Sequence, residues 1–439
     1  MAPFRPAIDS IARSKRRGRL RFRSLGAASK MAASRRSGQC GAPGAGGNMT
    51  KREPVAGVQP ELLRWARQTV GLSIEDAAHI GKLTAADLAA WEAGSDAPSY
   101  AQLEKLAYQV YKRPLAVFFL PAPPEEHVPQ REFRTLPDRD MRALSRDTYL
   151  QIRRAHAFQL SLAEVFAGRN PADIRIWKQL ALSLSAPVTE QARRIRDALG
   201  ISLHAQSTWK NDELALKHWR KAIEELGVFV FKSSFKQADI SGFCLIDETF
   251  PLIYLNNGTT KTRQTFSMLH ELAHILLGMN GLSKFDPDYI EHLPHAEQNI
   301  ERFCNAIAAE VLIPAADFRQ HAARLPRNAE SAPEQAFSEL ASRYGVSREA
   351  VLRRLLDQGR VTPSFYREQA ARWASQQRKS AGGNYYLNQG VYLSDRFARE
   401  VVGRHYRQQL TLEQAANFLD IKPKRFAGLE ERVLQGAET

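Results

Sequence analysis

Cysteine is scarce in this chain, and apolar runs are short. Only three of the 439 residues are cysteines (Cys40, Cys244 and Cys304), and they are odd in number and far apart. This excludes a disulfide framework and a CxxC metal clip, and it favours a reducing interior such as the cytoplasm. No apolar run approaches the roughly 20 residues that a membrane-spanning helix needs. We therefore expect a soluble globular protein of two or three domains and no membrane partner.

Acidic residues are nearly absent from the first 48 residues, which distorts the overall charge. Of the formal net charge of +15, this segment contributes about +10, because it holds eleven Lys or Arg residues and a single acid, Asp9. Residues 1–54 are rich in Arg, Ser, Ala and Gly with few apolar anchors, so we expect a disordered tail. Such a tail is typical of an organelle transit peptide or of an arm that touches nucleic acid. The interpretation that we favour is that translation begins at Met49.

The rest of the chain divides into four segments by pattern. Residues 55–122 carry apolar positions at helical spacing, and residues 123–141 are proline-rich and charged, which indicates a linker. Residues 142–360 mix long helical stretches with short β-rich runs, and residues 361–439 return to a helical pattern. The predicted fold class is α+β and mostly helical, with an all-α N-terminal domain, a central domain with a small sheet and a helical C-terminal extension.

A recurring helix-turn-helix pattern lies within the N-terminal segment. An LS pair opens the second helix, a WExG sequence follows the third, and a proline precedes the next leucine-rich helix. The residues that carry the pattern are Leu72, Ser73, Ala77, Trp91, Glu92, Gly94, Pro98, Leu103 and Ala107. The segment resembles the helix-turn-helix domain of lambda-repressor/Cro-type (XRE) proteins. That resemblance implies a DNA-binding domain.

The residues that would read DNA are nevertheless mostly missing. The recognition stretch, 84–91, offers no long polar donor for base edges, and Ile74 stands where the family often has Gln. Lys82, Arg64 and Arg67 remain as cations for a phosphate backbone, but such contacts position a protein without specifying a sequence. We therefore expect this domain to dock a protein or to dimerise. Weak, salt-sensitive DNA binding is the alternative.

The central segment changes from helical to β-type periodicity and back again. Three short runs rich in β-branched and aromatic residues predict a small sheet, the last two as a hairpin: 227–235, 241–248 and 251–257. Helices are predicted at 142–166, 189–199, 213–226, 263–278, 297–312, 334–358, 363–379, 394–409 and 412–431.

The pentad His-Glu-Leu-Ala-His, residues 270–274, is the sharpest chemical feature. Positions four apart on a helix differ by about 40° of rotation, so His270 and His274 project from one face and can share a metal ion. Glu271 lies close to the same face, near enough to contact a water without binding the ion. Two histidines at the edge of a core, paired with acids, are the alternative. The strongly apolar helix around the pentad favours the metal site.

A catalytic zinc site needs a third protein ligand, and the next predicted helix offers three glutamates. Glu301 and Glu310 are nine residues apart, about 180° around a helix, so only one of them can face the metal. We expect Glu310 to point to solvent, and Glu297 shares the face of Glu301 one turn earlier. His292 and His295 are also possible ligands, although the proline between them favours a loop.

A family resemblance decides between these ligands. The segment EQNIERFCNAIAAEVLIP (297–314) resembles the second signature of the ImmA/IrrE peptidases, the M78 or DUF955 metallopeptidases. The matching residues are Glu301, Cys304, Asn305, Ile307, Ala308, Ala309, Val311, Leu312, Ile313 and Pro314, with Cys304 and Ile307 replacing the usual Ala and Phe. The resemblance covers about 140–360. It implies a zincin-like, gluzincin-type domain in which Zn²⁺ is held by His270, His274 and Glu301, with Glu271 as the catalytic base.

The resemblance also implies a function. ImmA/IrrE relatives cut repressors and antitoxin-like regulators, so we expect a site-specific endopeptidase whose protein substrate is of that kind, with the N-terminal domain as a targeting module. A DNA-binding transcription regulator with a sensory or vestigial peptidase part is the first alternative, and a toxin–antitoxin component that acts by binding is the second. The complete set of four site residues favours the enzyme. Mn²⁺ or Fe²⁺ can also occupy two histidines and a carboxylate.

Two further parts of the site are assigned from position. A second donor to the oxyanion would complete the chemistry, and Tyr289 and Tyr254 are the candidates. Strand 251–257 precedes the metal helix, and in zincins an extended substrate often pairs with an edge strand there.

The C-terminal segment predicts a helix pair with a capping box at Thr411 and Gln414. Its basic edge is more simply explained as the solvated side of a packing cap than as a phosphate contact.

Overall fold

The computed structural model describes residues 53–126, 133, 143–284, 287–377 and 392–435. The predicted tail, apart from its last two residues, and most of the predicted linker lie outside these residues. The described chain is mostly helical with one small mixed sheet, as predicted for an α+β fold. Within it, no helix is long and apolar enough to cross a membrane.

The N-terminal segment consists of helices, as its apolar spacing predicted, and the WExG sequence forms the end of the third helix rather than following it. The helices are α1 (Pro60–Gln68), α2 (Ile74–Gly81), α3 (Ala85–Ala93) and α4 (Tyr100–Lys105), followed by the π-helix η1 (Leu106–Tyr111) and the 3-10 helix η2 (Leu115–Phe119). The hydroxyl of Ser73 accepts the backbone N–H of Asp76 at 3.0 Å, which caps α2 as expected. That these helices act as a helix-turn-helix domain stays a prediction.

The arginines of this segment are engaged with other parts of it. Arg67 donates to both carboxylate oxygens of Glu92, at 2.7 and 2.8 Å, and Arg64 donates to the backbone carbonyl of Glu92 at 2.8 Å. Glu92 itself is buried. The interpretation of Arg64 and Arg67 as cations available to a phosphate backbone is therefore not supported, because both already bind Glu92.

The sheet has four strands in the order β1-β3-β2-β4. They are β1 (Phe229–Ser233), β2 (Ile240–Leu245), β3 (Leu252–Asn256) and β4 (Gly281–Lys284). β3 pairs in parallel with β1 and antiparallel with β2, so the predicted hairpin is present. β3 has a strand on each side, and its backbone groups are therefore not free. The expectation that 251–257 is the edge strand for a substrate was wrong. The sequence analysis did not predict β4, which has only four residues. This strand lies at an edge of the sheet, next to β2.

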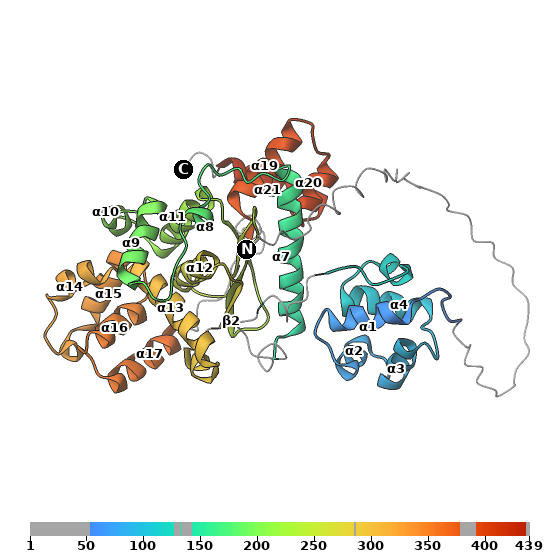
Figure 1. The fold of residues 1–439 in the computed structure, drawn as a ribbon, viewed down its shortest axis with the longest axis horizontal. Coiled ribbons are helices and arrows are strands. Elements are labelled where there is room, and N and C mark those ends of the chain that lie inside the picture. Colours follow the sequence, from blue (N-terminus) through green and yellow to red (C-terminus); the bar gives the residue numbers. More distant parts are fainter. Residues whose placement is uncertain (1–52, 127–132, 134–142, 285–286, 378–391, 436–439) are drawn as a thin grey trace, which may run out of the picture. The chain divides into compact units, whose positions relative to one another are not determined.

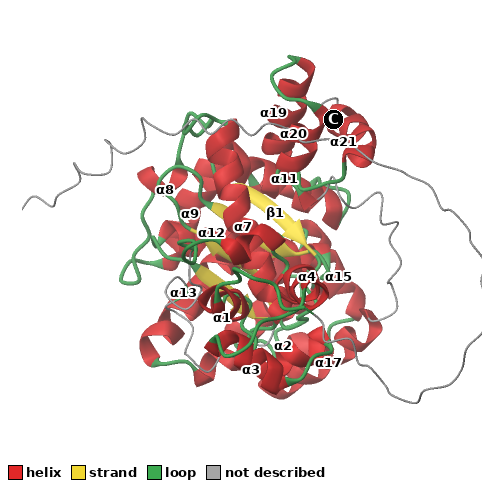
Figure 2. Cartoon of the chain, turned by 90° about the vertical axis from the view of Figure 1, so that its right-hand side faces the viewer, coloured by secondary structure: helices red, strands yellow, loops and turns green. Residues whose placement is uncertain are grey.

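Two apolar cores lie on opposite faces of the sheet, and Figures 1 and 2 show the strands among helices. The first core includes Val230, Cys244 and Ile253 and packs against α11 (Asp212–Glu225), α12 (Lys261–Leu276) and α13 (His295–Leu312). The second takes the alternate strand residues, among them Phe231 and Phe243, and packs against α7 (Arg146–Val165). Both faces are covered, so every residue of β1, β2 and β3 is buried.

The remaining helices complete the first core. They are α8 (Ile176–Gln179), α9 (Val188–Leu199), α10 (Leu203–Ser207), α14 (Ala315–Ala322), α15 (Glu334–Tyr344), α16 (Arg348–Asp357) and α17 (Pro363–Gln377), with the 3-10 helices η3 (Pro287–His292) and η4 (Ala329–Ser331). The single helix predicted at 334–358 is two helices. Gly345 ends the first in the left-handed region, with φ of 61°, and Ser347 caps the second.

The C-terminal extension is built into the second core. It consists of α19 (Asp395–Tyr406), α20 (Leu412–Phe418), the 3-10 helix η5 (Pro423–Arg425) and α21 (Phe426–Gln435). Phe397, Val401 and Phe426 are buried against residues of α7 and the sheet. The predicted capping box of Thr411 and Gln414 is present. These contacts are those expected of a packing cap.

Candidate metal centre

Helix α12 carries the histidine pentad on the face that meets the sheet and α13. The helix begins at Lys261 because the hydroxyl of Thr260 accepts the N–H of Arg263 at 3.3 Å. The apolar residues of α12 pack in the first core, and the polar residues between them are therefore buried as well. His270 is 3% exposed, and Glu271 and His274 are 0% exposed. Burial of three ionisable side chains on one helix costs free energy unless they form hydrogen bonds or ion pairs or bind a metal ion.

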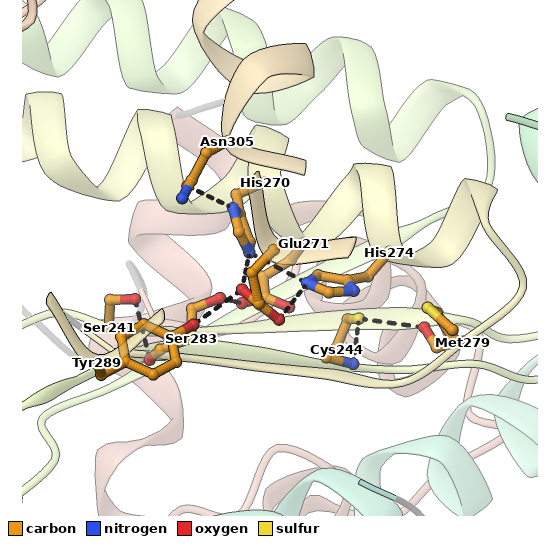
Figure 3. A network of polar contacts seen from close by, with 11 residues as sticks. Ser241, Cys244, His270, Glu271, His274, Met279, Ser283, Tyr289 and Asn305 are labelled. Carbon is orange, nitrogen blue, oxygen red and sulfur yellow. Dashed lines mark hydrogen bonds and ion pairs between the residues drawn. The ribbon is translucent and has the colours of Figure 1, made fainter. Parts of the chain in front are cut away.

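Helix α13 brings Glu301 to the two histidines. Its Oε2 lies 3.3 Å from Nε2 of His270, and its Oε1 lies 3.3 Å from Nε2 of His274. The two Nε2 atoms are 3.1 Å apart. One ligand atom from each residue lies within 4.8 Å of the others, and all three residues are buried (Figure 3). The three thus form a group that can hold a metal ion.

Electrostatics of the cluster point the same way. Burial opposes ionisation of Glu301, but the charges and hydrogen bonds of His274 and His270 outweigh it and hold the pKa of the carboxyl well below its usual range. Burial would also lower the pKa of His274, yet neighbouring Cys304 and Glu301 raise this pKa well above its usual value. Burial raises the pKa of the Cys304 thiol, and Glu301 brings a carboxylate to both histidines. The pocket therefore attracts a cation, and a metal ion would displace the proton held there.

Two side chains orient the ligands from outside. Asn305 places its Oδ1 2.9 Å from Nδ1 of His270, which directs the Nε2 lone pair toward the cluster. The hydroxyl of Tyr289 donates to Oε2 of Glu301 at 2.8 Å. The sequence identified Asn305 only as a match to the second signature. Its position on α13, one turn after Glu301, was the available signal for this second contact.

Of the two tyrosines proposed as oxyanion donors, only Tyr289 lies at the cluster. Tyr254 belongs to β3 and points into the second core, where its hydroxyl donates to Gln151 at 3.2 Å. The interpretation of Tyr254 as an oxyanion donor was wrong, because the alternation of side chains along a strand turns this residue to the opposite face.

The other candidate ligands lie elsewhere. Glu310 does not point to solvent as predicted: it is 7% exposed, accepts the N–H of Ala315 at 2.9 Å and pairs with Arg354 at 2.6 Å. Among the described residues, the cluster includes neither Glu297 nor His292 and His295, which are both exposed.

Glu271 contacts the cluster without joining it. Its Oε1 accepts a hydrogen bond from Ser283 of β4, whereas its Oε2 is buried and has no hydrogen-bond partner among the described residues. An orphaned carboxylate oxygen beside three converging ligand atoms fits a site built to receive an ion and a water. Two imidazoles and one carboxylate suit a divalent metal ion that keeps an open coordination position.

Comparison with known proteins agrees with this geometry. Residues 223–356 match the family model of peptidase M78, described as the IrrE N-terminal-like domain. The matched segment runs from α11 to α16 and contains the whole cluster. No curated protein matches the chain. The match supports the ImmA/IrrE resemblance and a metallopeptidase of that kind, and it covers neither the N-terminal helices nor the C-terminal extension.

Proposed function

We propose that this protein is a zinc-dependent endopeptidase that makes site-specific cuts in a regulatory protein. The observation that carries the proposal is the buried convergence of His270, His274 and Glu301 beside a carboxylate that has one free oxygen. Four such groups are costly to bury together without a ligand. A protein that acted only by binding would have no use for them.

Each residue has one role in this proposal. His270, His274 and Glu301 hold the ion, which would polarise the scissile carbonyl and make an attacking water more acidic. Oε2 of Glu271 takes the proton of that water and later delivers it to the leaving amine. Asn305 keeps the imidazole of His270 in its orientation, and Tyr289 does the same for the carboxylate of Glu301.

An extended substrate would reach the cluster along β4. This strand has a neighbour on one side in the described sheet, so its other edge offers backbone groups for pairing. Ser283 of β4 contacts Glu271, and Gly281 of β4 packs against the ring of His274. Peptide added to this edge would therefore pass the ion and the base together.

The N-terminal helices would supply the choice of substrate by contact with protein. Residues 53–126 hold six basic and ten acidic residues, and such a balance repels phosphate. The partner that we propose for these helices is a repressor-like or antitoxin-like regulator. Such a regulator could itself bind a helix-turn-helix surface.

A substrate trap tests the proposal. Full-length Glu271→Gln protein, loaded with Zn²⁺, should retain a partner on pull-down from the native host, and the wild-type protein should release the same partner as two defined fragments. His270→Ala protein, which loses a ligand, is the control and should not cut. If the wild-type protein leaves every trapped partner intact, the endopeptidase proposal fails and a binding function takes its place.

A further inference from the structure

Strand β4 lies unusually close to the metal helix. A Cβ added to Gly281 would sit 2.5 Å from Cδ2 of His274 and 2.9 Å from Oε2 of Glu271, so only glycine fits there. Alternation along the strand then turns Leu282 into the second core and Ser283 back toward α12. The glycine thus allows the approach that brings the serine to the carboxylate.

A β-bulge lies opposite Ser283. In the pairing of β2 with β4, Ile240 faces Lys284 and Gly242 faces Ser283, so the register shifts at Ser241. Bulges re-aim side chains and are common beside active sites. The hydroxyl of Ser241 donates to the backbone carbonyl of Ser283 at 3.1 Å, which fixes the backbone of β4 at this point.

The two oxygens of Glu271 are in different situations as a result. Oε1 accepts the hydroxyl of Ser283, which is itself 5% exposed, and Oε2 has no hydrogen-bond partner among the described side chains and backbone groups. A carboxylate held at one oxygen cannot rotate freely, so its second oxygen keeps one direction. Figure 3 shows Ser283 and Glu271 pointing toward each other beside the histidines.

We propose that Ser283 is a positioning residue that fixes Glu271 through Oε1 and thereby aims Oε2 at the attacking water. The inference rests on the proposed function for the role of Glu271 as base. In this account the side chain of Ser283 contacts neither ion nor substrate, and only the backbone of β4 pairs with the substrate. The side chain acts only through the carboxylate, so its removal should slow the chemical step and leave substrate binding unchanged.

The test uses the full chain with Ser283→Ala, Ser283→Thr and Ser233→Ala. The probe is a quenched-fluorescent peptide, selected from a random library for cleavage by the Zn²⁺-loaded wild-type protein. Ser283→Ala should lower kcat about 10- to 100-fold, as loss of a partner that orients a site residue does, with KM unchanged. Ser283→Thr keeps the hydroxyl and should retain most of kcat. Ser233→Ala is the matched control, because it removes a buried hydroxyl from β1, which lies at the opposite edge of the sheet from β4.

Crystal structures of the metal-free variants give a second readout that does not depend on activity. The carboxylate of Glu271 should keep its orientation in the wild-type and Ser233→Ala proteins and should turn or adopt several positions in Ser283→Ala. An unmoved carboxylate, or a fall in kcat no larger than that of Ser233→Ala, overturns the inference. If the wild-type protein cleaves no peptide, the proposed function fails, and the crystal structures still decide whether Ser283 fixes Glu271.

Discussion

A buried ion pair in the N-terminal helices and the metal centre differ in whether their charged atoms have partners. Arg67 and Glu92 bind each other through two hydrogen bonds and need nothing from outside. At the metal centre three ligand atoms face one another, and Oε2 of Glu271 has no partner among the described groups. A satisfied buried pair is explained by folding, whereas buried groups left unsatisfied cost stability and call for a ligand. We therefore expect Arg67 and Glu92 to stabilise the fold, and the cluster to bind a ligand.

The largest expected effect tests the chemical side of this comparison. His270→Ala or Glu301→Ala should abolish tight binding of one divalent ion per chain, because two remaining ligands do not form a catalytic site. Glu271→Gln should keep the ion and lose on the order of 10³-fold or more in kcat, since it removes the base alone. Elemental analysis of protein purified without chelators measures the first effect and peptide cleavage the second.

Glu297→Gln is the matched control for the ligand variants. It changes a glutamate on the same face of α13, one turn before Glu301, that is not part of the cluster. It should bind the ion as the wild-type protein does. Wild-type protein that contains no metal would remove the basis for the chemical assignment.

The C-terminal extension is a third region, and the residues that it adds to the second core are apolar. Phe397 is 0% exposed and stacks edge-on against Phe231, with ring centroids 5.9 Å apart. Phe397→Ala should therefore lower the free energy of unfolding by about 3–5 kcal/mol, while kcat per folded molecule stays unchanged. Phe119→Ala, at a position that is 43% exposed, should change stability by less than about 0.5 kcal/mol. Denaturant unfolding measures both, and equal effects would contradict a packing role for the extension.

The pair in the N-terminal helices should behave as structure alone. Glu92→Ala leaves the guanidinium of Arg67, which is 13% exposed, without its partner. Breaking a buried pair costs about 3–5 kcal/mol, and the partial exposure of Arg67 places the expected loss at or below the low end. Asp197→Ala removes an exposed pair with Arg193 and should cost less than about 1 kcal/mol. Calorimetry measures the stability of both variants. A Glu92→Ala protein as stable as the wild-type protein would show that the pair is not needed for folding.

Sequence periodicity located most helices and placed the two histidines on one helix face, since both depend on local spacing. The i, i+4 geometry of one helix is enough to place His270 beside His274. The half-turn between Glu301 and Glu310 correctly indicated that only one of these two lies with the histidines, and the family resemblance chose Glu301. The predictions that failed are those that depend on contacts with a segment far away in the sequence. Solvent exposure was expected for Glu310, because nothing near it in the sequence reveals Arg354, which is 44 residues away.

The sheet shows the same division. Three strands were predicted from their composition, but their order was not, so β3 was mistaken for an edge. Strand β4 has only four residues, two of them Gly and Ser, and gives no β-type signal. Its contribution, the hydroxyl of Ser283 at Glu271, depends on pairing with β2 across about 40 residues of chain. Such contacts follow from topology rather than from local pattern.

For DNA we expect no effect: the protein should show no sequence-selective binding. Sequence-selective binding needs cations for phosphate and polar donors for base edges. Arg113 of this segment is also engaged, donating to Glu126 at 2.6 Å and stacking 3.9 Å from the ring centre of Trp65. With Arg64 and Arg67 bound to Glu92, all three arginines within residues 53–126 have internal partners.

Selection from a random duplex library, with the full chain at about 150 mM salt, should therefore enrich no sequence. The basic segment 1–48 holds about +10 and could give non-selective binding that weakens steeply as salt rises, so a variant lacking residues 1–48 serves as the control. That variant should bind more weakly than the full chain at low salt and equally poorly at 150 mM. Enrichment of a single sequence at nanomolar affinity by both proteins would reverse the assignment of the N-terminal helices. It would mean that groups already satisfied within the fold are released for DNA, and that a satisfied pair is no guide to a structural role in this protein.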